Sequence, residues 1–280
     1  MKPTGNRILL LHPGEMGHAI GRALMAAGQT VSWVSENRSE ASRKRADSAG
    51  LTSVRNLRDG LADADLVLSV CPPDAAEAQA TTVAEAGYKG PYLDANAVAP
   101  ETVRRMGELL SKAGVQLIDG GIVGSPPKSS GTTRFFVSGT NAEEVTHLFS
   151  GSVVDAIPAG DAIGAASAVK MAYAAWTKGS SALLIAIRAL ARSEQVEALL
   201  LDEWARSQPA LVKRELGGSI AKAWRFVGEM HEVSKTFTDN DLPPGFHLAA
   251  AELYQALSPC KDNWDVTLED ALPLLVRPKS

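Results

Sequence analysis

Two parts of the sequence combine residue types and spacing that could do chemistry, and the first is a glycine turn near the start of the chain. Apolar residues 8–11 lead into His12-Pro13-Gly14-Glu15-Met16-Gly17, and an apolar-periodic segment follows and ends at Gly28. A strand, a tight turn and a helix N-terminus in this order can hold a pyrophosphate, because free N–H groups and the helix dipole face the anion. Gly14 would admit the phosphates, and Gly17 would let the helix pack closely on the strand. His12 takes the place of the first glycine in the G-x-G-x-x-G pattern, so a purely structural turn is the alternative.

The second part is Lys170, the one charged residue between Gly164 and Trp176, in a run of small and apolar residues. Burial disfavours the ammonium form, so a lysine in such surroundings can exchange protons near neutral pH. Tyr173 lies one helical turn further on the same face. The alternative is a structural lysine that extends its amine to water at the rim of an interface.

The residues after the second apolar run, 31–34, bear on the type of dinucleotide. An acidic residue at the end of this strand holds the ribose hydroxyls of NAD, whereas short polar side chains with an arginine suit the 2′-phosphate of NADP. Ser35, Asn37 and Arg38 therefore predict NADP. Glu36 keeps NAD as the alternative, because a shift of one residue would make it the ribose acid.

The first half of the chain alternates short apolar runs with longer helical patterns. Strands are expected at residues 8–11, 31–34, 66–70, 91–93, 115–118 and 135–137, and helices at residues 16–27, 39–49, 73–86 and 100–113. This alternation predicts an α/β fold with a Rossmann-type, doubly wound parallel sheet. From about residue 162 the pattern is almost entirely helical. We therefore expect a dinucleotide-binding domain at residues 1–159 and an all-helical domain at residues 160–280.

Composition excludes several classes of protein. The chain has 280 residues and a formal net charge of −4, which argues against binding to nucleic acid or to an anionic membrane. Cys71 and Cys260 are too few for a disulfide framework or a thiolate metal cage, and no cluster of carboxylates or thiols accompanies His12 and His18, so no metal is expected. No apolar stretch reaches the ~18 residues of a membrane span, and the polar start predicts no signal peptide. We expect a cytoplasmic protein.

Together these segments resemble the β-hydroxyacid dehydrogenase superfamily, which includes 6-phosphogluconate dehydrogenase. The glycine turn with its Met16-Gly17 pair is similar to the N-terminal motif of that family. Further similar segments are Val70-Cys71-Pro72-Pro73, residues 94–100 with Asn96 in the polar position, residues 119–125 with residues 131–139, and residues 164–170. The C-terminal part resembles a less-studied branch of the superfamily with a distinct C-terminal domain.

The resemblance implies roles for individual residues. It makes Lys170 the catalytic lysine and places Gly124 and Ser125 in the substrate loop. The residues expected to bind the cofactor are His12, Pro13, Gly14, Glu15, Met16, Ser35, Asn37, Arg38, Cys71, Pro72 and Asn96. The chain departs from the family where Tyr173 and Ala174 replace the usual asparagine after the lysine, and where Val123 stands in place of a serine. Because these residues would clamp the substrate, 6-phosphogluconate itself is not expected.

The leading functional hypothesis is hydride transfer between a nicotinamide cofactor and a small, anionic hydroxy acid or a related alcohol or carbonyl compound. Lys170 would take or give the hydroxyl proton. Tyr173, together with His247 or Tyr254 of the partner subunit, would shape the far wall of the site. Reduction of an imine or enamine is the alternative on the same scaffold. Related imine reductases usually replace the lysine, so Lys170 argues against this reading and Tyr173 keeps it open. A non-catalytic, cofactor-sensing reader is a third hypothesis, but the sequence has no added basic tail.

The segment from about residue 162 to 192 also predicts assembly. It is apolar nearly all round its circumference, which is typical of a helix buried in a bundle or an interface. We do not expect about 120 residues of helical domain to cover such a helix alone. Both the pattern and the resemblance imply a homodimer with interlocked helical domains.

Overall fold

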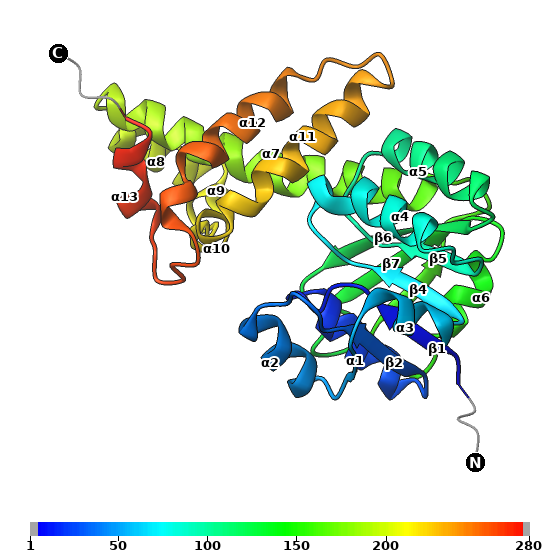
Figure 1. Ribbon diagram of the computed structural model, residues 1–280. Coiled ribbons are helices and arrows are strands. Elements are labelled where there is room, and N and C mark those ends of the chain that lie inside the picture. Colours follow the sequence, from blue (N-terminus) through cyan, green and yellow to red (C-terminus); the bar gives the residue numbers. More distant parts are fainter. Residues whose placement is uncertain (1–4, 277–280) are drawn as a thin grey trace. The chain divides into compact units, whose positions relative to one another are not determined.

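The computed structural model describes residues 5–276, and the chain divides into two compact units, Met1–Met171 and Ala172–Ser280 (Figure 1). The first unit contains a sheet flanked by helices, and the described part of the second is helical. The last strand ends at Pro158, whereas the units divide later, inside helix α7 (Ala165–Ser193), because the first turns of that helix pack on the sheet. The assignment of functional domains to residues 1–159 and 160–280 stays a prediction.

The sheet of the first unit has eight strands in the order β3-β2-β1-β4-β5-β6-β7-β8. The strands are β1 (Arg7–Leu10), β2 (Thr30–Val34), β3 (Thr52–Val54), β4 (Leu66–Ser69), β5 (Pro91–Asp94), β6 (Gln116–Gly124), β7 (Thr133–Ser138) and β8 (Asp155–Pro158). All neighbouring pairs are parallel except β6 with β7. The predicted Rossmann-type fold followed by a helical region is confirmed.

The antiparallel pair β6–β7 differs from the purely parallel sheet that the sequence predicted. Only a short loop separates Gly124 from Thr133. A parallel neighbour needs a crossover of a dozen or more residues, so a connection this short joins adjacent strands as a hairpin. Asp119 of β6 pairs with Ser138 of β7, and Gly124 pairs with Thr133. Because Asp119 also pairs with Asp94, the last residue of β5, the hairpin extends beyond the carboxyl end of β5.

Helices cover both faces of this sheet, as a doubly wound fold requires. Alternate residues of β1 point to opposite faces: Ile8 and Leu10 belong to one buried cluster, and Leu9 belongs to the other. The first cluster includes side chains of α1 (Gly17–Ala26), α2 (Glu40–Ser48) and α6 (Ala142–His147). The second includes side chains of α3 (Leu57–Ala62), α4 (Ala76–Glu85) and α5 (Pro100–Lys112). A 3-10 turn, η1 (Pro73–Ala75), precedes α4.

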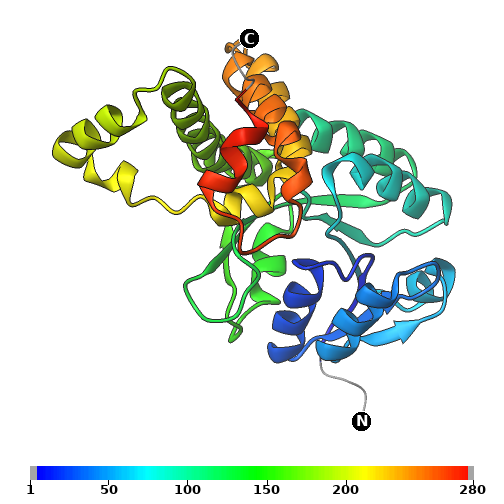
Figure 2. The same ribbon diagram turned by 90° about the vertical axis from the view of Figure 1, so that its left-hand side faces the viewer.

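The second unit contains the rest of α7 and a set of shorter helices. These are α8 (Glu197–Ser207), α9 (Pro209–Val212), α10 (Gly217–Ala221), α11 (Ala223–Thr238), α12 (Gly245–Ala256), η2 (Ser258–Cys260), α13 (Leu268–Ala271) and η3 (Leu272–Leu274). Helices α11 and α12 lie side by side (Figures 1 and 2). The buried Tyr254 hydroxyl of α12 donates to the Lys178 carbonyl of α7 at 2.7 Å. Lys178 in turn pairs with Glu229 of α11 at 2.9 Å, so α7 is joined to both helices.

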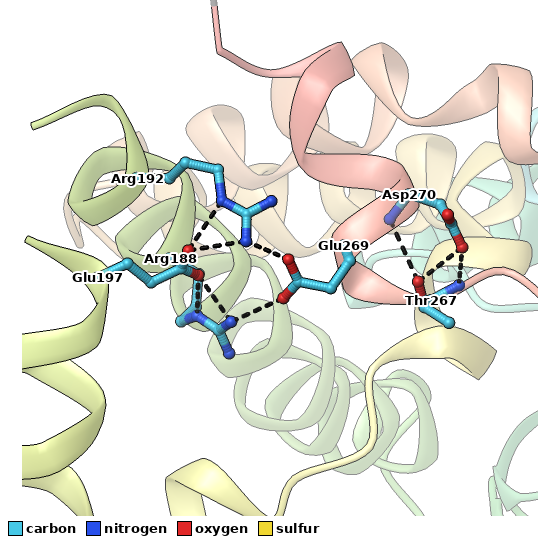
Figure 3. A network of polar contacts seen from close by, with 6 residues as sticks. All are labelled: Arg188, Arg192, Glu197, Thr267, Glu269 and Asp270. Carbon is cyan, nitrogen blue, oxygen red and sulfur yellow. Dashed lines mark hydrogen bonds and ion pairs between the residues drawn. The ribbon is translucent and has the colours of Figure 1, made fainter. Parts of the chain in front are cut away.

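A charged network joins the C-terminal part of α7 to its neighbours (Figure 3). Arg188 and Arg192 both donate to Glu197 at the start of α8, at 2.7 and 2.8 Å, and both also contact Glu269 of α13. Thr267 and Asp270 form a reciprocal capping box at the start of α13. The far end of α7 is thereby attached to α8 and α13.

The prediction of a long helix in this region is confirmed, but the chain does not bury it by itself. Trp176 is 74% exposed, Leu183 57% and Leu190 62%. Among residues 5–276, every helix is too short or too polar to serve as a membrane span.

Candidate functional site

The glycine turn between β1 and α1 has the geometry that its sequence predicted. A Cβ at Gly17 would lie 2.1 Å from the His12 carbonyl oxygen, so only glycine lets the helix start this close to the turn. A Cβ at Gly14 would meet nothing within 4 Å, so this residue faces open space. The backbone N–H of His18 donates to the Gly14 carbonyl at 3.0 Å, which closes the turn. Helix α1 begins without a side-chain cap at Met16, as a helix N-terminus that receives an anion would.

His12 and Arg38 lie together beside this turn. Burial and the nearby charge of Arg38 lower the pKa of His12 to about 4, so the imidazole is neutral at pH 7. Arg38 donates from Nη2 to the Leu11 carbonyl at 3.1 Å, and burial lowers its pKa from the ordinary value. His12 Nδ1 and Arg38 Nε are both buried and have no hydrogen-bond partner within residues 5–276. Two polar groups thus remain available at the edge where the dinucleotide is expected.

The residues after β2 are arranged less simply than the sequence suggested. The Ser35 hydroxyl donates to the Val54 carbonyl at 3.0 Å, so it supports the pairing of β2 with β3. Glu36 and Asn37 are exposed, and Asn37 has a positive φ of 58°. Arg38 is the predicted residue in this group that reaches back to the glycine turn. The structure therefore leaves both Arg38 and Glu36 as candidates to contact the ribose end of a dinucleotide.

Asn96 joins the loops that follow β4 and β5. It is 2% exposed and accepts from the Cys71 N–H at 2.6 Å. Its amide nitrogen donates to Asp94 at 2.5 Å and to Ser69 Oγ at 3.1 Å. Both amide atoms are occupied, so Asn96 shapes the Cys71-Pro72 loop by holding its backbone. Burial raises the pKa of Cys71 to about 12, which makes it a thiol rather than a nucleophilic thiolate at neutral pH.

Lys170 lies directly on a glycine of the sheet. A Cβ at Gly121 of β6 would be 2.4 Å from the Ala166 carbonyl oxygen and 3.1 Å from the Lys170 Cβ. The preceding residue, Gly120, is closed from the other face, where a Cβ would lie 2.6 Å from the Phe135 ring and 2.9 Å from the Asp94 carbonyl oxygen. The first turns of α7 therefore touch the backbone of β6, and Lys170 is half-buried there.

Strand β6 ends at Gly124, and the loop to β7 begins with Ser125; both residues are predicted to contact the substrate. Gly124 has a φ of 113°, and a Cβ there would lie 2.1 Å from the Thr132 carbonyl oxygen. Ser125 is exposed, and its carbonyl accepts from Thr133 Oγ1 at 2.6 Å. Arg22 of α1 donates to the Pro127 carbonyl at 3.3 Å. The predicted substrate loop is therefore attached to the helix that begins at the glycine turn.

Tyr173 and His247 belong to the second unit. Tyr173 is 41% exposed on α7. His247 of α12 is 6% exposed, burial lowers its pKa, and its ring lies 4.5 Å from that of Phe237. Its Nδ1 has no hydrogen-bond partner in the described part of the chain. His247 lines an apolar groove of about 570 Å³ together with Trp176 and Phe246. Its predicted contribution to a site across subunits stays a prediction.

Sequence reasoning gave no role to Asp119, Ser138 or Ser167. All three side chains are buried, and the hydroxyls of Ser138 and Ser167 both donate to the Asp119 carboxylate. Asp119 stands in a motif that the sequence did single out, but its partners are far away along the chain. The structure also places no three His, Cys, Asp or Glu side chains together as a metal site within residues 5–276.

Comparison with known families adds to this geometry. Residues 9–151 match the NAD binding domain of 6-phosphogluconate dehydrogenase, and residues 191–257 match a domain of unknown function. The chain belongs to the 6-phosphogluconate dehydrogenase-like family. The glycine turn, the Asn96 loop and the β6–β7 hairpin all lie within the part that matches its NAD-binding domain. Membership of this family confirms the resemblance drawn from the sequence and makes the chain a member of an NAD-binding oxidoreductase family.

Two relatives of this family member cover most of the chain. An uncharacterized 28.5 kDa protein of Methanothermus fervidus is 24% identical over 230 residues, which make up 80% of this chain and 88% of that protein. A solved conserved protein of unknown function, described as structurally similar to 3-hydroxyacid dehydrogenases, is 26% identical, with a TM-score of 0.65 over 91% of this chain and 97% of that one.

Two solved enzymes share the fold at lower identity. The Mycobacterium tuberculosis 3-hydroxyisobutyrate dehydrogenase is 17% identical, with a TM-score of 0.71 over 97% of this chain and 99% of that one. The Aspergillus terreus reductive aminase in complex with NADPH is 18% identical, with a TM-score of 0.58 over 91% of this chain and 93% of that one. At such identities these two likenesses establish the fold.

Proposed function

We propose that the protein transfers a hydride between a nicotinamide cofactor and a small hydroxy acid or a related alcohol or carbonyl compound, with Lys170 as general acid and base. Membership of the family and the open glycine turn support dinucleotide binding. The observation that carries the catalytic part is the position of Lys170 on Gly121, on the strand that leads into the predicted substrate loop.

The residues at the turn fit a dinucleotide. Gly14 faces open space, and the buried His12 Nδ1 and Arg38 Nε are polar atoms with no partner in the described chain. Arg38 favours NADP, because a 2′-phosphate accepts charge-assisted hydrogen bonds from a guanidinium group. The exposed Glu36 makes NAD the alternative. When bound, the nicotinamide ring supplies the hydride acceptor or donor.

Lys170 acts as the general acid and base. In the oxidative direction its neutral amine accepts the hydroxyl proton of the substrate, the C–H bond releases its hydrogen and electron pair as hydride, and a C=O bond forms. In the reductive direction the ammonium form donates the proton to the oxygen. Gly124 at the end of β6, and Ser125 and the exposed Lys128 of the β6–β7 loop, would contact an anionic group of the substrate.

Reduction of an imine is the second candidate. It is favoured by Tyr173, whose side chain is 41% exposed one helical turn after Lys170, and by the fold shared with the reductive aminase. In this reaction the protonated Lys170 or the Tyr173 hydroxyl would supply the proton to nitrogen. Retention of a lysine at position 170 makes the hydroxy-acid reaction the leading one.

The test replaces the amine of Lys170 with Lys170→Met. Turnover of short 2- and 3-hydroxy acids with NADP⁺ and NAD⁺ should fall by at least about 100-fold, the usual contribution of a general acid or base. Binding of NADPH, followed by fluorescence titration, should stay within about twofold of the unchanged protein, a difference of roughly 0.4 kcal/mol. Lys112→Met, at the exposed end of α5, is the control and should alter neither property.

The outcomes separate the candidates. Unchanged hydroxy-acid turnover in Lys170→Met would remove Lys170 from the mechanism. Turnover confined to cyclic imines, or to ketones with amines, in the presence of NADPH would favour imine reduction. Binding of NADPH without turnover of any of these compounds would favour a cofactor-sensing protein.

We further propose a cytoplasmic homodimer formed through the helical units. All strongly exposed large apolar side chains of the described residues lie between Val169 and Leu274, although residues 5–168 form more than half of the chain. Apolar patches of this kind mark interaction surfaces. Trp176, Leu183 and Phe246 surround the 570 Å³ groove and would be covered by the second copy. The free thiols of Cys71 and Cys260 suit a reducing compartment.

A further inference from the structure

Asp119 is a buried carboxylate on β6 that accepts hydrogen bonds from two other segments, strand β7 and the start of α7. It is 0% exposed. Ser138 Oγ of β7 donates to Oδ2 at 2.8 Å. The N–H groups of Gly164 and Ser167 donate to the same oxygen at 3.0 and 3.1 Å, and Ser167 Oγ donates to Oδ1 at 2.6 Å. Both carboxylate oxygens thus accept hydrogen bonds, and three of the four donors belong to the start of α7.

These contacts are an N-terminal cap supplied by the sheet. The first N–H groups of a helix have no partner within the helix, and a carboxylate satisfies them and interacts favourably with the helix dipole. A cap normally comes from the residue just before the helix. Here it comes from β6, and Ser138 Oγ accepts a further N–H, that of Ala166, at 3.1 Å. The same bonds that cap α7 therefore attach it to the strand.

The attachment determines where Lys170 lies. Asp119 and Gly121 are two residues apart on β6 and so face the same side of the sheet. Asp119 holds Ser167, and Gly121 contacts Ala166 and the Cβ of Lys170. Ser167 and Lys170 are three residues apart and so lie on one face of the helix. Asp119 therefore fixes the rotation and the axial position of α7, and Gly121 fixes how close it lies.

We infer that Asp119, through Ser138 and Ser167, is a positioning residue that holds Lys170 in register for proton transfer. This inference depends on the proposed role of Lys170. Asp119 itself is buried and does not contact substrate. A displacement of about 1 Å in a reacting group costs on the order of 100-fold in rate, so a small shift of α7 is enough to matter.

The principal test is Asp119→Asn, which keeps the shape of the side chain but replaces one accepting oxygen with an NH₂ group that faces other donors. We expect kcat to fall by at least about tenfold while KM for the nicotinamide cofactor stays within about twofold. Asp155→Asn, on the exposed start of edge strand β8, is the control and should leave kcat unchanged.

A double-variant cycle distinguishes positioning from general weakening of the fold. In the Lys170→Met background, Asp119→Asn should cause no further loss, because no amine remains to be positioned. Hydrogen exchange gives a readout independent of activity: the amides of residues 164–171 should lose protection in Asp119→Asn, whereas those of β1 should not. Equal losses in both backgrounds, or unchanged protection of residues 164–171, would overturn the inference.

A second variant covers the case in which Asp119→Asn fails to fold. Ser167→Ala removes one donor and keeps the backbone bonds, and it should lower kcat by at least about threefold only when Lys170 is present. Unchanged kcat in Ser167→Ala would contradict the inference. If Lys170→Met alone leaves turnover unchanged, the proposed function fails instead, so the two failures are distinguishable.

Discussion

Asp94 and Asp119 lie opposite each other in the parallel register of β5 and β6, and both are fully buried. Asp119 accepts four hydrogen bonds, whereas Asp94 accepts from the side chain and the backbone N–H of Asn96, at 2.5 and 3.3 Å. Burial and the charge of Asp119 raise the pKa of Asp94 to about 7, despite these two bonds. The carboxyl end of the sheet thus contains one acid that takes up a proton in the physiological range.

The raised pKa of Asp94 gives a pH dependence of stability with a definite sign. Its ordinary value is 3.8, so between about pH 4 and pH 7 the folded protein keeps a proton that the unfolded chain has lost. The contribution of Asp94 to the free energy of unfolding therefore decreases as pH rises through this window, and it is level above about 7. Asp94→Asn should remove the decrease, which amounts to a few kcal/mol at about 1.4 kcal/mol per pKa unit. Urea unfolding at several pH values checks this, and parallel curves for the two proteins would refute it.

Gly14 and Gly17 should respond differently to the same substitution. Gly17→Ala places a Cβ 2.1 Å from the His12 carbonyl oxygen, so we expect a loss of about 1–3 kcal/mol in stability from overpacking. Gly14→Ala meets no neighbour within 4 Å, so its stability should change by less than about 0.5 kcal/mol. The affinity of the Gly14→Ala variant for NADPH should nevertheless fall at least about tenfold, because the added methyl group occupies the space of the pyrophosphate. Thermal unfolding and fluorescence titration measure the two effects. If Gly14→Ala binds NADPH as tightly as the unchanged protein, the pyrophosphate does not bind beside Gly14.

Arg38 should determine the choice between NADP and NAD. A hydrogen bond to a charged group is worth about 1.5–3 kcal/mol, so Arg38→Leu should weaken NADPH binding at least about tenfold and NADH binding by much less. Glu36→Gln is the matched variant for the opposite reading and should weaken NADH binding only if Glu36 holds the ribose. Titration of the unchanged protein and of both variants with NADPH and NADH shows which residue determines the choice of cofactor. If Arg38→Leu lowers the affinities for NADPH and NADH equally, Arg38 does not bind the 2′-phosphate and the prediction is wrong.

The proposed homodimer should depend on the apolar groove of the helical unit. Trp176→Glu puts a charge on a side chain that is 74% exposed in the single chain and should yield a folded monomer. Burying an unpaired carboxylate in the interface would cost several kcal/mol. Sedimentation velocity reports the assembly, and circular dichroism reports the fold. Arg58→Glu, on the exposed face of α3, should remain dimeric. A monomeric unchanged protein at micromolar concentration would contradict the proposal.

Much of the first unit could be predicted because its determinants are local. The apolar run of β1, the turn from His12 to Gly17 and the start of α1 follow one another in the sequence, and each acts on its neighbours. Strand β3 was missed because it has only three residues, of which Thr52 and Ser53 are exposed. The short helices α3 and α6 were also missed, because six residues are too few to show a helical period.

The remaining features depend on contacts between distant residues. The apolar pattern of a buried strand such as β7 is the same in either direction. Its direction follows from the short connection between Gly124 and Thr133, which became apparent only when the fold showed where β6 ends. Asp119 meets Ser138, Gly164 and Ser167 at separations of 19, 45 and 48 residues. No spacing rule links them. The apolar neighbours of Lys170 in the sequence predicted that it exchanges protons. Only the fold shows that Lys170 lies on Gly121.

The pair Gly120-Gly121 has a consequence for engineering. Phe135 leaves no room for a side chain at Gly120, and α7 leaves none at Gly121, on the opposite side of the same strand. Libraries that diversify these two codons would recover mostly insoluble clones, whatever substrate is used for selection. Attempts to broaden the range of accepted molecules should begin instead at Lys128, Ser129 and Ser130, whose exposed side chains can be enlarged without disturbing the scaffold.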